Sequence, residues 1–273
     1  VIGTCAFGIE CNSFKHPDAE FRAMGRELFT FNFRRAIKSF IAINFPKLAM
    51  QLSLRISVEK VGNFFRKVVT DTVKLRQEEN IHRNDFLQLL INLQESTNFT
   101  HDEMTAQVIS FFIAGFETSA TTMNFGLYEL ARNPDIQKKL REEICQVLDK
   151  HDNKLTYESL SEMKYLAQVL DGEYCHFWRK IAKKLFFTET LRMYPPLPTL
   201  NRRCTKDYTL RDTNVVLEKG TRVLISALGL QMDPEFYPNP KKFDPDRFSE
   251  ESKKMRHPFV YLPFGDGPRN CIG

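Results

Sequence analysis

Residues 263–273 read Pro-Phe-Gly-Asp-Gly-Pro-Arg-Asn-Cys-Ile-Gly and are the most informative segment of this 273-residue chain. Three glycines and two prolines predict a shaped loop whose backbone amides approach the sulfur of Cys271. Cysteine ligates iron as the thiolate, and amide donors together with a cation stabilise that form. Arg269 provides a cation that could pair with an anionic group of the molecule that carries the iron. The alternative is a glycine-rich turn that holds a cysteine by chance. It is less favoured, because the motif specifies the residue type at many positions.

Two further motifs each carry an arginine. Residues 189–192 read Glu-Thr-Leu-Arg and precede Tyr194-Pro195-Pro196. Glu and Arg three residues apart share one helix face and can pair, although a surface ion pair of little energetic value is the more common case. Residues 243–248, Phe-Asp-Pro-Asp-Arg-Phe, hold Arg247 between Pro and Phe, and this motif alone is more typical of a surface arginine.

The apolar pattern of residues 101–132 predicts one long helix, ended by Asn133-Pro134. In its middle, residues 114–119 read Ala-Gly-Phe-Glu-Thr-Ser. A carboxylate among apolar neighbours is costly unless it is paired or has a function. The Thr118 hydroxyl can donate to the carbonyl of Ala114 and open a polar notch in the helix. A satisfied core hydroxyl is an equally good interpretation.

The rest of the chain predicts a mainly α fold with small β-sheets. Helices are expected at 17–31, 58–79, 85–94, 134–149 and from 156 onward. Short strands are expected at 208–210, 215–217 and 221–225, with a turn at Lys219-Gly220. The proline-dense tract from Pro234 is expected to be irregular coil that packs through its aromatic residues.

Composition narrows the possible functions. Lys and Arg number 39 against 34 Asp and Glu, giving a formal net charge of +5 without a dense basic block, so no nucleic-acid partner is expected. The longest apolar run, 111–116, is far shorter than the roughly 20 residues that a membrane span needs. The six cysteines form no Cys-x-x-Cys pair, which argues against a disulfide framework or a zinc site. The first residues form no secretory signal. Because the chain has no initial Met and stops at Cys271-Ile272-Gly273, we expect a fragment.

Taken in order, these segments resemble the cytochrome P-450 superfamily of haem-thiolate monooxygenases. Phe264–Gly273 matches the cysteine-loop signature FxxGxRxCxG of that superfamily at every specified position. Residues 114–119 look like its oxygen-activating motif, Glu189 and Arg192 like its ExxR pair, and Arg247 like the third member of that structural triad.

The amino-acid sequences of three segments extend the resemblance to the insect microsomal, xenobiotic-metabolising branch. These segments are 5–10, 114–119 and 264–269. The resemblance implies a cytochrome P-450 fold over residues 1–273, incomplete because the early helices and the helix after Cys271 are missing. It also implies that residues 33–54, where basic side chains lie beside apolar ones, contact a bilayer surface.

The resemblance implies a role for each matching residue. Cys271 would be the axial ligand of the iron in haem b (iron protoporphyrin IX), and Arg269 and Arg202 would pair with the haem propionates. Glu117 and Thr118 would help to deliver protons during oxygen activation. The other residues implied to contact haem are Phe264, Gly265, Gly273 and Ala114. The residues implied to line the substrate pocket are Phe111, Phe112, Phe116, Leu197, Pro198 and Leu200.

The implied activity is insertion of one oxygen atom from O2 into a small lipophilic substrate such as a xenobiotic, a hormone or a fatty acid. Electrons would come from NADPH through cytochrome P-450 reductase, with cytochrome b5 as a further donor, at the cytosolic face of the endoplasmic reticulum membrane. One alternative is a truncated product without catalytic activity. Another is a haem-thiolate isomerase or dehydratase, which Glu117 beside Thr118 disfavours.

Residues 172–188 depart from the family pattern, which runs from Asp171 directly into Glu-Thr-Leu-Arg. Gly-Glu-Tyr at 172–174 can be encoded with a splice donor, and Leu-Phe-Phe-Thr at 185–188 with a splice acceptor. We therefore interpret this insertion of 17 codons, or 51 nucleotides, as a retained intron. Amplification of cDNA across it should yield a product 51 nucleotides shorter, and transcripts that all keep the segment would contradict the interpretation.

Overall fold

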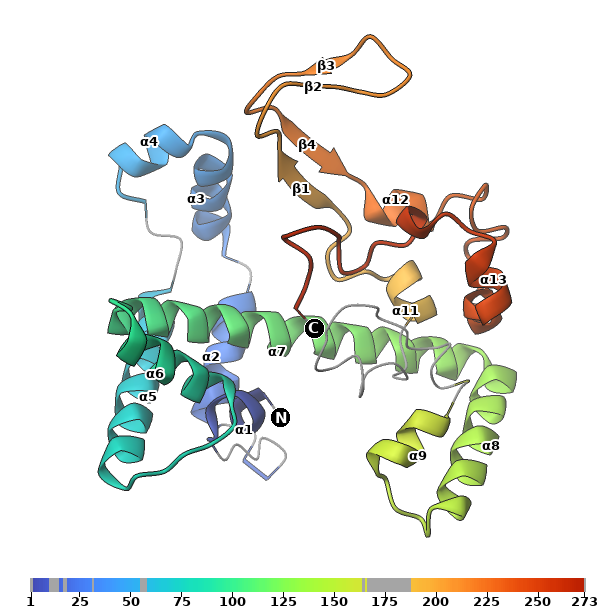
Figure 1. Cartoon of the computed structure of the whole chain (residues 1–273), viewed down its shortest axis with the longest axis horizontal. Helices are drawn as coiled ribbons and strands as arrows, with labels where there is room; N and C mark the ends of the chain where they lie inside the picture. The colour runs from blue at the N-terminus through green and yellow to red at the C-terminus, as the bar shows by residue number, and fades with distance from the viewer. Residues whose placement is uncertain are drawn as a thin grey trace. The chain divides into compact units, whose positions relative to one another are not determined.

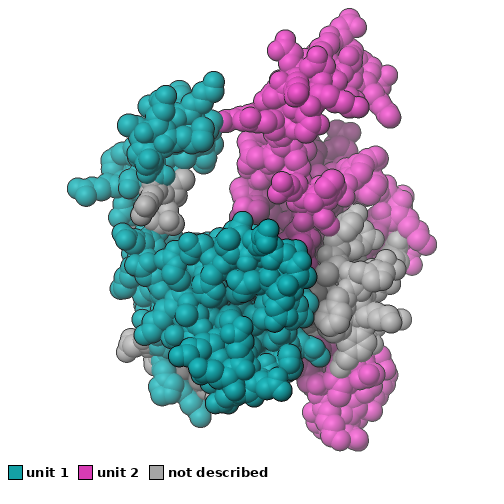
Figure 2. Space-filling model, turned by 60° about the vertical axis from the view of Figure 1, so that its left-hand side comes forward, with its two compact units in different colours: residues 1–118 teal, residues 119–273 magenta. Residues whose placement is uncertain are grey.

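The computed structural model (Figure 1) describes residues 2–9, 15–16, 19–30, 32–54, 58–163, 165 and 188–272. The chain divides into two compact units, residues 1–118 and 119–273 (Figure 2). Of the predicted insertion, only Thr188 is among the described residues. No helix in the described ranges is both long and apolar enough to cross a membrane.

The regular secondary structure in the described part of unit 1 is all helical. Its helices are α1 (Ile2–Phe7), α2 (Glu20–Phe29), α3 (Phe33–Asn44), α4 (Pro46–Gln51), α5 (Glu59–Glu78), α6 (Phe86–Ser96) and the first part of α7 (His101–Arg132). Helix α7 has the bounds predicted from its apolar pattern, and α5 and α6 lie where helices were expected. Pro17 and Asp18, the predicted helix start, lie outside the described residues, and α2 begins at Glu20.

The core of unit 1 is rich in phenylalanine, of which the whole chain has 24. Four apolar residues four positions apart on α5 are buried: Val61, Phe65, Val69 and Val73. The Phe21 ring packs edge-to-face against the rings of Phe65 and Phe112 at centroid distances of 5.5 and 5.3 Å. Helix α2 approaches α7 closely at Gly25, where a Cβ would lie 2.8 Å from the Phe116 ring.

Helices α3 and α4 pack against each other and leave many apolar side chains exposed. None of the α3 residues is buried. The exposed apolar residues on and just after these helices are Phe33, Ile37, Phe40, Ile43, Phe45, Leu48, Met50 and Leu52, which we call the α3–α4 apolar patch. So many exposed apolar side chains within 20 residues are unusual on a protein surface that faces only water.

Unit 2 combines helices with two small sheets in its described part. Its further elements are α8 (Pro134–Lys150), α9 (Tyr157–Glu162), α11 (Thr188–Met193), β1 (Leu200–Arg203), β2 (Tyr208–Thr209), β3 (Val216–Leu217), β4 (Arg222–Ile225), α12 (Ala227–Gln231), η1 (Pro245–Phe248), α13 (Glu250–Lys254) and η2 (Pro258–Val260). Strand β1 pairs antiparallel with β4, and β2 pairs antiparallel with β3.

Some of these elements were not predicted from the sequence. Strand β1 was not predicted because Leu-Asn-Arg-Arg has low strand propensity, and its pairing with β4 supplies the stability that its composition lacks. The tract after Pro234 is not irregular coil throughout, since it contains η1, α13 and η2. Ser249 begins α13 by accepting a hydrogen bond from the Ser252 amide, a short-range capping signal.

Candidate functional site

The segment around Cys271 forms a closed loop. The Cys271 amide donates to the carbonyl of Phe264 over 2.8 Å, and the Asn270 amide donates to Gly267 over 3.0 Å. Gly265 and Gly267 have φ angles of 72° and 81°, a left-handed conformation that L-residues with a side chain rarely adopt. The loop therefore needs glycine at both positions, and it leaves the Cys271 side chain exposed at its end.

Strand β1 supports this loop from one side. The Arg202 guanidinium donates to the carbonyl of Asp266 over 3.1 Å, and the Leu200 side chain lies against Gly265. The two predicted propionate ligands thus differ, because Arg202 is anchored to the loop and half-buried while Arg269 is exposed. Of the other predicted residues here, Phe264 is half-buried, Gly265 is buried, and Gly273 lies outside the described residues.

The structure brings Glu189, Arg192 and Arg247 together in the interior of unit 2. Arg192 donates to both carboxylate oxygens of Glu189, over 2.6 and 2.8 Å. The Arg247 Nε lies 3.7 Å from the Glu189 carboxylate. The Glu189 and Arg192 side chains are 0% exposed, and that of Arg247 is 12% exposed. The alternative of surface arginines is therefore wrong for both motifs.

Backbone groups make further hydrogen bonds with Arg192 and Glu189, while the buried Arg247 Nε has no hydrogen-bond partner among the described residues and faces the Glu189 carboxylate at 3.7 Å. Arg192 also donates to the carbonyls of Gln231 and Pro240, over 2.8 and 2.7 Å. The Asp244 amide donates to Glu189 over 2.9 Å. Burial raises the pKa of Glu189, while the hydrogen bonds and charge of Arg192 act in the opposite direction. A carboxylate at this depth stays compatible with folding only because cations and amides surround it.

Gln231 connects this cluster to the residues before the cysteine loop, and no sequence motif indicated this role. Its side-chain amide donates to the carbonyls of Leu191 and Arg192, both over 3.0 Å, and its Oε1 accepts from the Leu262 amide. The Tyr261 hydroxyl donates to the Thr188 carbonyl over 3.0 Å. Helix α11 is thereby tied to the residues that lead into the loop.

The predicted notch in α7 has the predicted hydrogen bond. The Thr118 hydroxyl donates to the carbonyl of Ala114, and Glu117 is half-buried beside it. The predicted pocket residues in this region lie within or against the unit 1 core. Phe112 is almost fully buried, and the Phe111 ring stacks on Phe86 at a centroid distance of 4.2 Å.

The other predicted pocket residues lie in unit 2, just before and within β1. Leu197 and Pro198 are exposed, and Leu200 is half-buried beside the cysteine loop. Glu117 and Thr118 belong to unit 1, and the cysteine loop belongs to unit 2.

The family model of cytochrome P-450 matches residues 1–172 and 184–273, nearly the whole chain, including the cysteine loop and the Glu189 cluster. This chain belongs to the cytochrome P-450 family. The matched ranges leave out 173–183, which fall within the segment predicted to be an insertion.

Curated relatives of this cytochrome P-450 include several from insects. The chain is 46% identical over 276 residues to probable cytochrome P-450 6a13 and 45% identical over 285 residues to cytochrome P-450 6a2, both of Drosophila melanogaster. It is 42% identical over 296 residues to cytochrome P-450 6k1 of Blattella germanica. Each match covers the entire chain, which spans about half the length of these relatives, 52% to 53%.

The donor chemistry of this cytochrome P-450 chain fits a haem iron. A haem iron would take a protein ligand that is accessible, and the Cys271 thiol is exposed at the end of a closed loop. Among the described residues, no group of three or more His, Cys, Asp or Glu side chains could hold a metal by itself. A single thiolate suits an iron whose other ligands come from a macrocycle.

A contact that no motif predicted joins α7 to Tyr194, the residue after α11, in this cytochrome P-450. The Tyr194 hydroxyl donates to the buried carboxylate of Glu129 over 2.5 Å, and its ring stacks on Phe125 at 4.3 Å. Burial and the nearby Glu129 carboxylate raise the pKa of Tyr194 to about 12. Helix spacing offered a signal, because Phe125 and Glu129 are four residues apart and so share one face.

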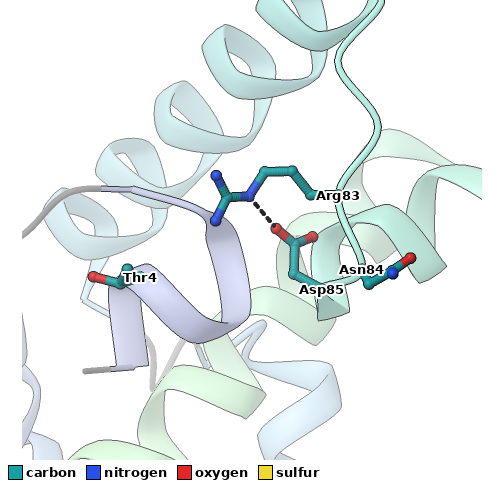
Figure 3. A pocket seen from close by; sticks show the side chains of 4 residues that line it. All are labelled: Thr4, Arg83, Asn84 and Asp85. Carbon is teal, nitrogen blue, oxygen red and sulfur yellow. Dashed lines mark ion pairs between the residues drawn. The ribbon is translucent and has the colours of Figure 1, made fainter.

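A surface pocket in unit 1 lies apart from all predicted site residues. It is lined by Thr4, Arg83, Asn84 and Asp85 (Figure 3). The Asp85 carboxylate already pairs with buried Arg76 over 2.6 Å and with Arg83 over 3.3 Å. Burial raises the pKa of Asp85, but hydrogen bonds from Arg76 and the Gln88 amide outweigh it, so the pKa lies below its usual value. These charges satisfy one another, and we assign the pocket a structural role.

Replacing Glu189 with Gln should destabilise the fold strongly. The change leaves Arg192 charged, 0% exposed and without its ion-pair partner, which costs about 3–5 kcal/mol of unfolding free energy. Urea unfolding measures the loss. As a matched control, Glu142→Gln removes a carboxylate of the exposed pair with Lys138 and should cost at most about 1 kcal/mol. Equal effects of the two changes would contradict the role assigned to Glu189.

Proposed function

We propose that this protein is a haem-thiolate monooxygenase that inserts one oxygen atom from O2 into a small lipophilic substrate. The observation that carries the proposal is the exposed Cys271 at the end of the glycine-stabilised loop. Haem, when bound, supplies an iron that activates dioxygen, and the thiolate donates electron density to it. Arg202, held against the loop, and the exposed Arg269 would bind the propionates.

The notch in α7 would manage protons in this reaction. The Thr118 hydroxyl donates its hydrogen bond to the Ala114 carbonyl, so the lone pairs of its oxygen can accept a hydrogen bond from another group. The half-buried Glu117 is an acid next to it that can hold or release a proton. Phe111, Phe116, Leu197, Pro198 and Leu200 would offer apolar contacts to the substrate, and Phe112 would support them from the core.

The remaining parts of the proposal concern partners and location. The electron donor would be an NADPH-dependent cytochrome P-450 reductase, with cytochrome b5 as a second donor. Substrates would be xenobiotics, hormones or fatty acids, since apolar side chains dominate the proposed pocket. We place the protein at the cytosolic face of the endoplasmic reticulum membrane.

Carbon monoxide binding tests the proposal. The chain expressed with haem, reduced and exposed to carbon monoxide, should show the strongly red-shifted Soret band of a thiolate-ligated haem. Cys271→Ala should abolish that band, while Cys145→Ala, which changes an exposed cysteine on α8, should leave it intact. Haem binding by the Cys271→Ala variant with an unchanged band, or no haem uptake by the unaltered chain, would contradict the proposal.

The α3–α4 apolar patch supports the membrane part of the proposal. Its apolar side chains lie among basic ones, including Arg34, Lys38 and Lys47, a combination that suits the interface of a bilayer with anionic lipid headgroups. Phe40 and Ile43 are 62% and 63% exposed on α3. Inserting them into a bilayer would remove most of that apolar surface from water.

Replacing Phe40 and Ile43 together with Ser should weaken sedimentation with vesicles of anionic phospholipid at least about tenfold. The estimate follows from losing about 1.5–3 kcal/mol for each large apolar side chain that is buried. Leu89→Ser is a matched control, because Leu89 is 67% exposed but lies on α6 outside the patch. If the double variant binds vesicles as well as the control does, the patch is not the membrane contact.

A further inference from the structure

Arg256 occupies a junction in unit 2 that no motif indicates. It lies between α13 and η2, 15 residues before Cys271 in the sequence. Its guanidinium donates to the carbonyl of Arg247 over 2.5 Å. It also lies over two aromatic rings, 4.7 Å from the centroid of Tyr237 and 4.8 Å from that of Phe248. One side chain therefore makes a charge-assisted hydrogen bond and two cation–π contacts.

Both of the rings under Arg256 are core residues. Tyr237 is 0% exposed and Phe248 is 2% exposed, and they share a small apolar cluster with Val260. A guanidinium held on buried rings has a fixed position, since moving it would expose those rings and its own partly desolvated charge. The anchor point of Arg256 is thus rigid, unlike that of an arginine at the surface.

The partner of Arg256 is the backbone of the third triad residue. Arg247 has its carbonyl bound by Arg256, its Nη2 bound to the Asn239 carbonyl over 3.1 Å, and its Nε 3.7 Å from Glu189. The Tyr237 ring is shared, because the Arg192 guanidinium lies 5.2 Å from the same centroid. Arg256 therefore contacts, directly or through one ring, both arginines that face Glu189.

We propose that Arg256 is a positioning residue, which fixes Arg247 against Glu189 and so sets the path of the chain into the cysteine loop. The inference rests on the proposed function, because the loop matters only if Cys271 binds haem. The path is short, since η2 at 258–260 follows Arg256 directly and Tyr261 and Leu262 are bonded to Thr188 and Gln231. A shift at Arg256 is transmitted to Cys271 through this backbone.

The first experiment needs no haem and uses a double-mutant cycle. Arg247→Gln and Arg256→Gln are made singly and together, and the folding equilibrium constant of each chain is measured by urea unfolding. If Arg256 positions Arg247, losing Arg256 removes part of what Arg247 contributes. The double variant should then be at least about threefold more stable than the product of the two single effects predicts. Independent, multiplicative effects would overturn the proposal.

The second experiment measures haem affinity by titration. Arg256→Gln should lower haem affinity about tenfold, the size typical when a residue that supports a ligand is lost. Lys254→Gln, which removes an exposed charge at the end of α13, should leave it unchanged. Arg256→Lys keeps the charge but cannot cover two rings while reaching the Arg247 carbonyl, so it should recover only part of the affinity. Full recovery by Lys, or no loss with Gln, would overturn the proposal.

The two experiments separate the failure of this proposal from that of the proposed function. An unaltered chain that takes up no haem contradicts the function, whereas the cycle on the haem-free chain still decides whether Arg256 positions Arg247. If Arg256→Gln does not fold, Arg256→Lys replaces it in the cycle, with the same criterion of non-multiplicative effects.

Discussion

A carboxylate without access to water organises unit 2. Glu189 receives two hydrogen bonds from Arg192, one from the Asp244 amide and the field of Arg247. Removing these charges from water is expensive, and the cost is offset only while every partner keeps its place. The segments that supply the partners are therefore fixed relative to one another. Helix α11, the turn at 240–244 and η1 form one framework because they share one anion.

Hydrogen bonds to this framework hold the cysteine loop in position. Gln231 binds carbonyls of α11 on one side and the Leu262 amide on the other, and Tyr261 binds the Thr188 carbonyl. A thiol at the end of a loop of glycines has little rigidity of its own, since glycine restricts the backbone weakly. The buried pair of Glu189 and Arg192 restricts the loop through these hydrogen bonds. This explains why residues that touch no substrate occur together with the cysteine motif.

The sequence predicted the parts of the fold that depend on local patterns. Helix α7 and the hydrogen bond from Thr118 to Ala114 follow from apolar spacing and from the geometry of a hydroxyl within one helical turn. Strand β1 depends on a partner strand 19 to 25 residues away, and Gln231 on partners 31 to 40 residues away. The role of Arg256 depends on contacts with aromatic rings, which no local pattern records. The burial of Glu189 and Arg192 was equally invisible, because the same motif on a surface helix would read identically.

The apolar surface of α3 and α4 has a consequence for handling this protein in solution. Side chains such as Phe33 and Met50, 69% and 72% exposed, present apolar surface to water when no membrane or detergent is present. Two copies in plain buffer can reduce this exposure by packing their apolar surfaces together. The apparent molecular mass should accordingly rise with protein concentration and fall when detergent is added, so the colloidal state of a preparation reports how this surface is covered.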